Sequence, residues 1–275
     1  MAWLGFALLL ARTAHAQSAL DAERAEYLHW LTTSPTSPLA ALAQQPIGGG
    51  LRVGPADAEI PLEGTPEHRV EARPGGVRLT GPSGTRILPR GVPVAVGRYT
   101  LVAEGSSGRE VLTVFGPARS AKRPSYYEPS PAWIFVGPLI PPARHATTRV
   151  LGLDGIEVEA AEAGSVVVPV SGRRVPLLVR RLPLAGGEES ELEIFFRDET
   201  NGRGTYPAGR FVTLMPAGQG RYRLDFNRAR NPFCAYSSAY PCPAPWRGNA
   251  LPAPVTAGER YGRGGPVAPT GDSAR

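Results

Sequence analysis

The sequence predicts a mainly β protein, in which an N-terminal helix precedes a small β-sandwich and then a larger antiparallel β-barrel or sandwich. The chain has 275 residues, among them 33 glycines and 30 prolines, and this composition favours short strands joined by turns over long helices. Many short stretches alternate apolar and polar residues, as half-buried strands do. The length allows one large domain or two smaller ones, each with its own core.

The first residues have the pattern of a secretory signal. An apolar run over residues 3–11 precedes the triplet Ala-His-Ala at 14–16, which has small residues at the two positions that signal peptidase reads. The run is too short to span a bilayer. We therefore expect a signal peptide over residues 1–16, cleavage near Ala16, and a mature chain that begins at Gln17. The mature protein would be periplasmic or extracellular, without a transmembrane segment.

An amphipathic helix is predicted directly after the signal. Residues 19–31 place four apolar residues on one face, namely Leu20, Ala25, Leu28 and Leu31. The prolines of the following TSPTSPL stretch stop the helix, because proline supplies no amide donor and its ring clashes with a continuing turn. Residues 17–46 therefore form a helix and a proline-rich connection.

Short strands follow over residues 47–117. Pro-Gly-Gly at 74–76 and Ser-Ser-Gly at 106–108 are typical of hairpin turns, so this part is predicted to be a small β-sandwich. The next stretch, residues 118–149, is rich in proline and has no clear period. It predicts a linker packed across the surface.

The order of motifs in this sandwich resembles a forkhead-associated domain. That family holds a phosphothreonine peptide with a Gly-Arg element and a Ser-x-x-His element. The segment Thr-Pro-Glu-His at 65–68 stands where the second element would be, whereas the nearest arginine to the first, Arg52, lies out of position. The resemblance therefore implies a scaffold, not phosphopeptide binding.

The strand pattern resumes over residues 150–262, in stretches such as GSVVVPVSG, SELEIFFRDE and GRYRLDFNRA. Their spacing predicts a barrel or sandwich of six or more antiparallel strands. Residues 263–275 offer nothing to bury, so we expect a disordered tail.

Charge does not indicate a nucleic-acid partner. The formal net charge is +6, but the basic residues are scattered arginines, Lys122 is the only lysine, and no basic block occurs. No nucleic acid and no cofactor are expected. Metal binding is not expected either, because no CxxC or HExxH spacing is present and the histidines of the mature chain (His29, His68 and His145) lie far from the cysteines in sequence.

Two cysteines, Cys234 and Cys242, lie in a short proline-rich loop. In an oxidising compartment such a pair favours a disulfide that closes a small ring. A reactive thiol or a metal ligand is the alternative for each of them.

Three blocks near the C-terminus carry a family resemblance. They are FFRDETNGRGTYPAGRFV (195–212), YRLDFNRARNPFCAYSSAYPCPAP (222–245) and NALPAPVTAGERY (249–261). In order and spacing they resemble an uncharacterised bacterial family, domain of unknown function 1684. The resemblance implies an architecture and the place of a site, but no known activity.

The polar residues of these blocks form the candidate site. Asp225 and Asn227 alternate with Phe226, so they point to one face. Asp225 is predicted to pair with Arg210 or Arg228, and Asn227 to cap the turn at Asn231. The candidate ligand-binding residues are Asp198, Arg203, Tyr206, Arg210, Asp225, Asn227, Arg228, Asn231, Tyr236 and Glu259.

Three functions remain open from the sequence. The first is a binding or envelope-associated module that uses this Arg/Tyr/Asn face for an anionic or polar small molecule or an envelope component. The second is a hydrolase-type enzyme with Asp198, Asp225 or Glu259 as acid and base. The third is a purely structural interaction protein. No histidine lies in the region, which excludes Ser-His and Cys-His nucleophile schemes.

Overall fold

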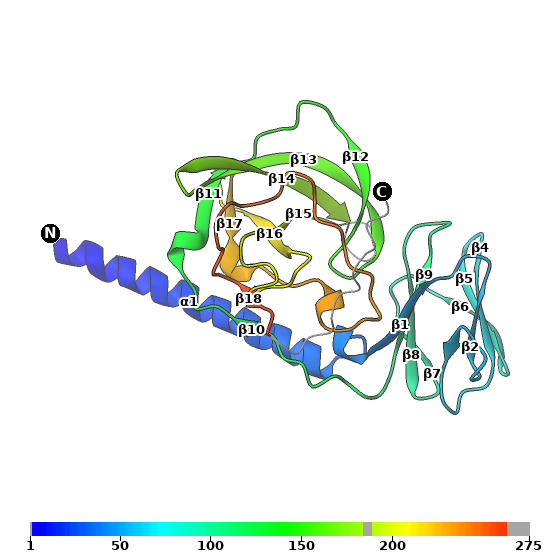
Figure 1. Cartoon of the computed structure of the whole chain (residues 1–275). Helices are drawn as coiled ribbons and strands as arrows, with labels where there is room; N and C mark the ends of the chain where they lie inside the picture. Colours follow the sequence, from blue (N-terminus) through cyan, green and yellow to red (C-terminus); the bar gives the residue numbers. More distant parts are fainter. Residues whose placement is uncertain (1, 184–188, 263–275) are drawn as a thin grey trace.

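The computed structural model describes residues 2–183 and 189–262, and the predicted tail, residues 263–275, lies outside them. The described chain is mainly β: one N-terminal α-helix precedes two small sheets and then a seven-stranded antiparallel sheet, as the sequence predicted (Figure 1). Among the described residues, no helix has the length and apolarity that a membrane crossing requires.

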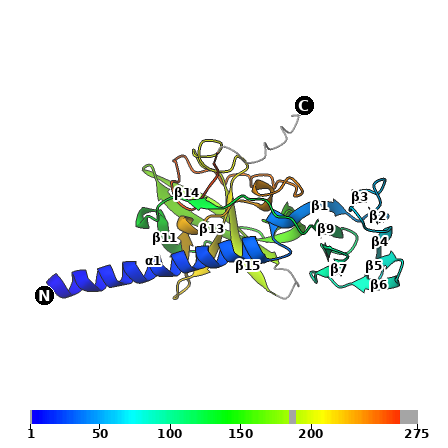
Figure 2. The same cartoon turned by 90° about the horizontal axis from the view of Figure 1, so that it is seen from below.

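The helix α1 spans Ala2–Thr33 and is therefore longer than the predicted amphipathic stretch. Its buried face differs in part from the predicted one. Leu20 and Leu31 are buried, but Leu28 is 38% exposed. Tyr27 takes its place in the contact, because the helix packs on the loop that carries the cysteines. Figure 2 shows α1 running along the larger sheet towards the two small ones.

The two small sheets are built from nine strands: β1 (Ala41–Pro46), β2 (Leu51–Gly54), β3 (Ile60–Pro61), β4 (His68–Arg73), β5 (Gly76–Gly81), β6 (Gly84–Leu88), β7 (Val94–Val96), β8 (Tyr99–Glu104) and β9 (Val111–Phe115). The first sheet has the order β1-β9-β8-β7 and the second β3-β2-β4-β5-β6. One apolar cluster contains residues of both sheets, such as Leu79 of β5 and Leu101 of β8. The two sheets therefore form a sandwich around a shared core. Its first strand, β1, begins inside the stretch predicted as a connection.

The larger sheet is built from seven strands: β11 (Ile134–Pro138), β12 (Thr147–Leu151), β13 (Glu157–Val170), β14 (Arg173–Pro183), β15 (Ser190–Phe196), β16 (Arg210–Pro216) and β17 (Arg221–Asp225). Their order is β11-β17-β16-β15-β14-β13-β12. The edge strand β11 comes from the proline-rich stretch predicted as a linker. Its five residues pair antiparallel with β17. The local sequence pattern did not predict this strand, because the strand depends on a partner that is distant in sequence.

The larger sheet curls until its two ends approach each other (Figure 1). Ile140, which follows β11, forms two backbone hydrogen bonds of 2.8 Å with Ser165 of β13. The approach depends on Gly164, whose φ is +137° and at which a Cβ would lie 2.2 Å from the Ile140 carbonyl oxygen. The sheet is therefore strongly curved, and its shape is intermediate between that of an open sandwich layer and that of a closed barrel.

The C-terminal segment fills the curved sheet. Residues 251–257 contribute Leu251, Ala253, Val255 and Ala257 to the same core as Phe196 and Phe226. A final short strand, β18 (Glu259–Arg260), pairs with β10 (Ser125–Tyr126). The last blocks of the sequence thus lie inside and across one face of the larger sheet.

Candidate functional site

The predicted site residues Asp198 and Arg210 form a buried ion pair. Arg210 Nη2 donates to Asp198 Oδ2 at 2.9 Å, and neither side chain has exposed area. The guanidinium also donates to the carbonyl oxygens of Val255, Ala257 and Glu259. Arg210 was one of the two partners predicted for Asp225, and the structure pairs it with Asp198. It fastens the C-terminal segment to the start of β16.

Asp225 and its neighbours connect three segments of the chain. Asp225 Oδ2 lies 2.8 Å from Arg223 Nη2 and 3.7 Å from Arg228 Nε. Arg228 also forms an ion pair with Glu23 of α1. The second of the two predicted partners of Asp225, Arg228, is therefore found beside it.

Asn227 is buried, and its side chain hydrogen-bonds with Ser130 and not with the turn at Asn231 that it was predicted to cap. Its Oδ1 accepts from the Ser130 amide at 2.9 Å, and its Nδ2 donates to the Ser130 carbonyl oxygen at 3.0 Å. The carboxamide therefore holds the proline-rich stretch against the short 3₁₀ helix η3 (Phe226–Arg228).

Glu259 is a fully buried carboxyl group with three donors. The Asn231 backbone amide and side-chain Nδ2 each donate to it at 2.8 Å, and the Tyr236 hydroxyl donates as well. Burial raises the pKa of Glu259 to about 7, although these donors oppose the shift. A small cavity of about 190 Å³ borders Glu259 and Lys122. Three carboxyl groups were considered for acid/base chemistry. In the described chain, Asp198 and Asp225 each have an ion-pair partner, whereas Glu259 has none and borders a cavity. Its acid/base role stays a prediction.

Arg203 lies apart from the other candidates. It is exposed in the loop between β15 and β16, and its Nη2 donates to the Glu199 carbonyl oxygen at 3.1 Å. Most of the candidate side chains therefore bond to one another or to nearby backbone, and they leave few free donors on this face.

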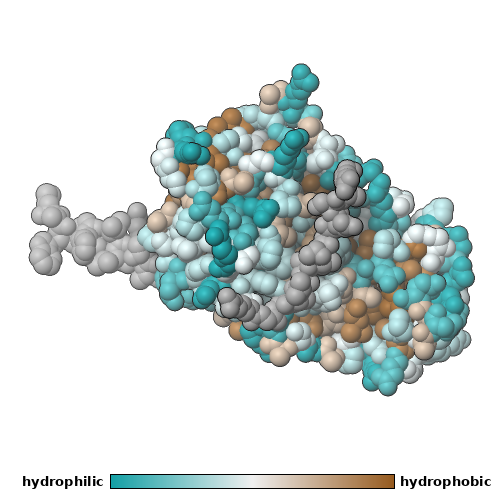
Figure 3. Space-filling view, in the orientation of Figure 1, coloured by the Kyte–Doolittle hydropathy of each residue, from teal (hydrophilic) through white to brown (hydrophobic). Residues whose placement is uncertain are grey.

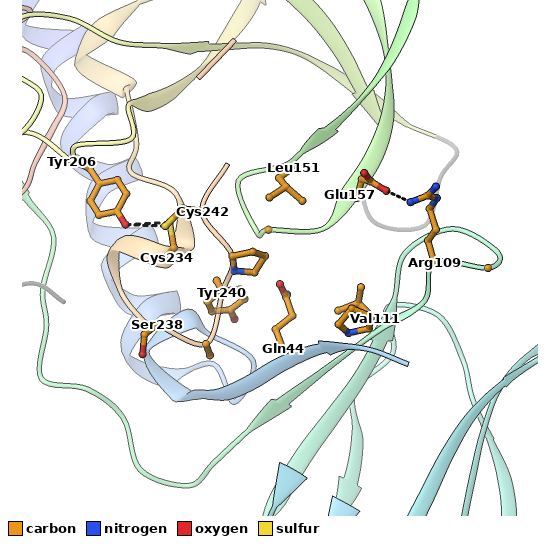
Figure 4. A pocket seen from close by; sticks show the side chains of 15 residues that line it. Gln44, Arg109, Val111, Leu151, Glu157, Tyr206, Cys234, Ser238, Tyr240 and Cys242 are labelled. Carbon is orange, nitrogen blue, oxygen red and sulfur yellow. Dashed lines mark hydrogen bonds and ion pairs between the residues drawn. The ribbon is translucent and has the colours of Figure 1, made fainter. Parts of the chain in front are cut away.

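A larger cavity, of about 830 Å³, lies where the sandwich meets the larger sheet. The space-filling view shows apolar residues at the surface in this region (Figure 3). Both halves contribute to the lining: Gln44 and Val111 come from β1 and β9, whereas Leu151 and Tyr240 come from the larger sheet and the cysteine loop (Figure 4). Of the predicted site residues, Tyr206 lines this cavity.

The cysteines lie at the Tyr206 end of this cavity (Figure 4). The predicted disulfide between them is not formed: Cys234 is a buried free thiol and Cys242 a partly exposed one. The Tyr206 hydroxyl lies 3.3 Å from Cys234 Sγ and 3.1 Å from Cys242 Sγ. A hydrogen bond with Cys234 lowers the pKa of Cys242, and the same bond, together with burial, raises the pKa of Cys234.

An ion pair stands at the other end of the cavity. Arg109 Nη1 of the β8–β9 loop lies 2.7 Å from Glu157 Oε2 at the start of β13, and both side chains are partly exposed (Figure 4). The pair joins the sandwich to the larger sheet, and the two charges neutralise each other. The cavity is therefore mainly apolar, with hydrogen-bonding groups at the cysteine end.

Sequence reasoning missed most of this cavity. Its residues come from segments that are distant in sequence, from Gln44 to Cys242. Neither Gln44 nor Arg109 belongs to a motif. The one local signal of the cavity was the concentration of cysteines, prolines and tyrosines in the 222–245 block, part of which forms one wall of the cavity. In the described part of the chain, no group of three or more His, Cys, Asp or Glu residues could hold a metal ion.

Known proteins give a family but no activity. An uncharacterized protein of Haloarcula marismortui, solved in solution by NMR, is 30% identical over 51% of this chain and 77% of its own, with a TM-score of 0.44. Among curated proteins, none matches the chain. Residues 122–260 match the family described as "Protein of unknown function (DUF1684)", a range that contains all three C-terminal motif blocks except Tyr261. With half of its length matched, the chain belongs to the DUF1684 family of proteins of unknown function.

Proposed function

We propose that this protein is a binding module that takes a small molecule into the cavity between the sandwich and the larger sheet. One observation carries the proposal: the sandwich, the larger sheet and the cysteine loop together line a half-open pocket of about 830 Å³. Ligand pockets of proteins commonly measure roughly 300–1,000 Å³ and occur preferentially where two domains meet. A space of this size has room for a molecule of several rings or a short chain.

The lining indicates the chemistry of the ligand. Val111, Leu151 and Tyr240 offer apolar contact, whereas Gln44 and Tyr206 offer hydrogen bonds. The charges of the Arg109–Glu157 pair cancel, so the cavity favours a largely apolar ligand with polar groups over a strongly charged one. The anionic or polar ligand expected from the sequence is thus replaced by an uncharged, largely apolar ligand that carries a few polar groups.

The residues of the predicted Arg/Tyr/Asn face have a supporting role in this proposal. Arg210 and Asp198 are tied to each other and to the C-terminal segment, so they hold the loop that carries Tyr206. Asn231 and Glu259 similarly hold the start of the cysteine loop against β18. These contacts shape one wall of the cavity and do not themselves reach its ligand.

Binding of Nile red, a neutral apolar fluorophore, tests the proposal. The full chain is expected to bind it at one site, with increased fluorescence. Ala239 lines the cavity, so Ala239→Trp should fill the space and reduce the affinity at least tenfold. Ala118 is exposed and does not line the cavity, so Ala118→Trp is the matched control and should bind as the parent does. Equal binding by both variants would overturn the proposal.

Export completes the proposed function, with an envelope component as the alternative partner. Residues after the expected cleavage site hold α1 against the rest of the chain. Arg24 Nη2, for example, donates to the Asn227 carbonyl oxygen at 3.2 Å, and Glu23 pairs with Arg228. Cleavage near Ala16 would leave these contacts in place, so a mature chain that begins at Gln17 would keep them.

A further inference from the structure

Small-molecule binding does not account for the two thiols at the end of the cavity. Cys234 lies in the short 3₁₀ helix η4 (Phe233–Ala235), and Cys242 follows in the same proline-rich loop. Both line the cavity, but they differ in access, because Cys234 is buried and Cys242 is partly exposed. One sulfur is thus placed to meet a molecule in the cavity and the other stands behind it.

The surroundings of the pair favour a negative charge on the accessible sulfur. Both sulfurs lie within hydrogen-bonding distance of one hydroxyl, that of Tyr206, which is 3.3 Å from Cys234 Sγ and 3.1 Å from Cys242 Sγ. The Tyr206 hydroxyl has one proton, which it donates to one of the two sulfurs at a time, and the Cys234 thiol supplies a second proton beside Cys242. Hydrogen bonds of this kind stabilise a thiolate, which is the nucleophilic form of cysteine. The pKa of Cys242 is lowered to about 6 by the bond with Cys234 first and the bond with Tyr206 second.

We propose that Cys242 and Cys234 form a thiol–disulfide exchange site whose substrates are small-molecule disulfides that enter the cavity. Cys242 is the attacking cysteine and Cys234 the resolving one. Tyr206 is a positioning residue that holds both sulfurs. The disulfide expected from the sequence and the free thiols of the structure are then the oxidised and reduced states of one site. The proposal rests on the proposed function only in that the substrate uses the same cavity.

The exchange proceeds in two balanced steps. First, the Cys242 thiolate attacks one sulfur of the substrate disulfide; a Cys242–substrate disulfide forms, and the other half leaves as a thiolate. Next, Cys234 gives its proton to the released thiolate and attacks Cys242 Sγ, which expels the second half as a thiolate. The protein is oxidised by two electrons to a Cys234–Cys242 disulfide, and the substrate is reduced to one thiol and one thiolate. The reverse reaction oxidises two small thiols.

The order of attack follows from the contacts. While Cys242 is a thiolate, it accepts a hydrogen bond from Cys234 and keeps that thiol protonated. Once Cys242 is part of a mixed disulfide it has no charge, so it is a weaker acceptor and Cys234 loses its proton more easily. The resolving step is thereby enabled by the first one.

Reaction of the reduced full chain with hydroxyethyl disulfide tests the proposal. The parent protein should lose two hydrogens in mass and release two small thiols per chain. Cys234→Ser, which retains a hydroxyl donor, should accumulate one adduct at Cys242. Cys242→Ser should react at least about tenfold more slowly, because a buried protonated thiol is a poor nucleophile. An adduct on Cys234, or equal rates for the two serine variants, would overturn the proposal.

A second measurement needs no cysteine substitution. In the parent protein, brief treatment with iodoacetamide followed by peptide mapping should find Cys242 alkylated about tenfold faster than Cys234. Tyr206→Phe should slow the alkylation of Cys242 and move its pH profile to higher pH, which a merely structural tyrosine would not do. Alkylation of both cysteines at the rate of an unfolded control would overturn the assignment.

The failure of the exchange site can be told from the failure of the binding function. Nile red binding that is blocked by Ala239→Trp, together with unreactive cysteines, would leave the binding function standing and overturn the exchange. Rapid exchange with hydroxyethyl disulfide in a chain that does not bind Nile red would leave the exchange site standing and overturn the binding function.

Discussion

The Arg109 guanidinium lies 2.7 Å from the Glu157 carboxylate and thereby joins a loop of the sandwich to the first residue of β13. The two side chains line one end of the cavity between the sandwich and the larger sheet. Both are partly exposed, so the pair contributes little to stability, on the order of 1 kcal/mol or less. We predict that a ligand passes this contact when it enters or leaves the cavity.

Removing this pair should change binding rates more than stability. Arg109→Ala is expected to raise both the association and the dissociation rate of Nile red several-fold, since the end of the cavity is then open. Stopped-flow fluorescence measures both rates. Arg69→Ala breaks the exposed pair between Arg69 and Glu71 on the second sheet and serves as the control. Identical rates in the two variants would contradict a gating position for Arg109.

The ion pair between Asp198 and Arg210 should determine stability. Arg210→Ala leaves the Asp198 carboxylate buried and unpaired, a change that costs about 3–5 kcal/mol. Urea denaturation followed by circular dichroism measures the loss. The exposed Arg203 lies in the same loop region, and Arg203→Ala should change stability by less than about 0.5 kcal/mol. A folded Arg210→Ala protein of parent stability that no longer binds ligand would instead favour the binding role predicted from the sequence.

The buried Glu259 should make stability fall as pH rises. Its pKa is raised from 4.5 to about 7 by burial, so the folded state holds a proton that the unfolded state releases. This contribution to stability is complete below about pH 4.5, declines between pH 4.5 and 7, and is absent above that range. The loss amounts to about 3 kcal/mol at most, since one pKa unit corresponds to about 1.4 kcal/mol. Burial also raises the pKa of Glu104 and Glu193 to about 7 and raises that of Asp154, so these three groups act in the same direction.

Substitution isolates the share of Glu259. In Glu259→Gln the decrease of unfolding free energy from pH 4.5 to 7 should be smaller by about 3 kcal/mol, because glutamine does not titrate. The absolute stability is expected to be lower at all pH values, since the amide nitrogen cannot accept the bonds that the carboxyl oxygens accept from Asn231 and Tyr236. Glu26→Gln, at an exposed position of α1, is the matched control. The same pH slope in all three proteins would rule out the assignment.

The helix should remain docked after signal cleavage. A chain isolated from the export compartment is expected to begin at Gln17, which intact mass measures. Leu31 has no exposed area and packs in the cluster with the cysteine loop, so Leu31→Ala should cost about 2–5 kcal/mol. Leu28→Ala, on the exposed side of the same helix, should cost far less. A mature chain that begins after Leu31 would contradict both expectations.

Local patterns were sufficient for much of the architecture. Alternation and turn residues predicted the sandwich and the larger antiparallel sheet. Successive side chains of a strand point to opposite faces, so a half-buried strand can be recognised from the order of its own residues. They did not predict β11, whose five residues become a strand through pairing with β17. The buried face of α1 was also only partly predicted, because Tyr27 and Arg24 contact groups that no sequence window contains.

The candidate site shows the same division. From the sequence alone, a family resemblance indicated that the last three blocks belong together, Arg210 or Arg228 was offered as the partner of Asp225, and the loop with both cysteines stood out by its composition. Only the tertiary structure decided that Arg210 pairs with Asp198 and that Asn227 binds Ser130. It also decided that a cavity lies between the sandwich and the larger sheet. The reason is physical: strand patterns depend on neighbours along the chain, whereas ion pairs and cavities depend on the distances between segments that folding brings together.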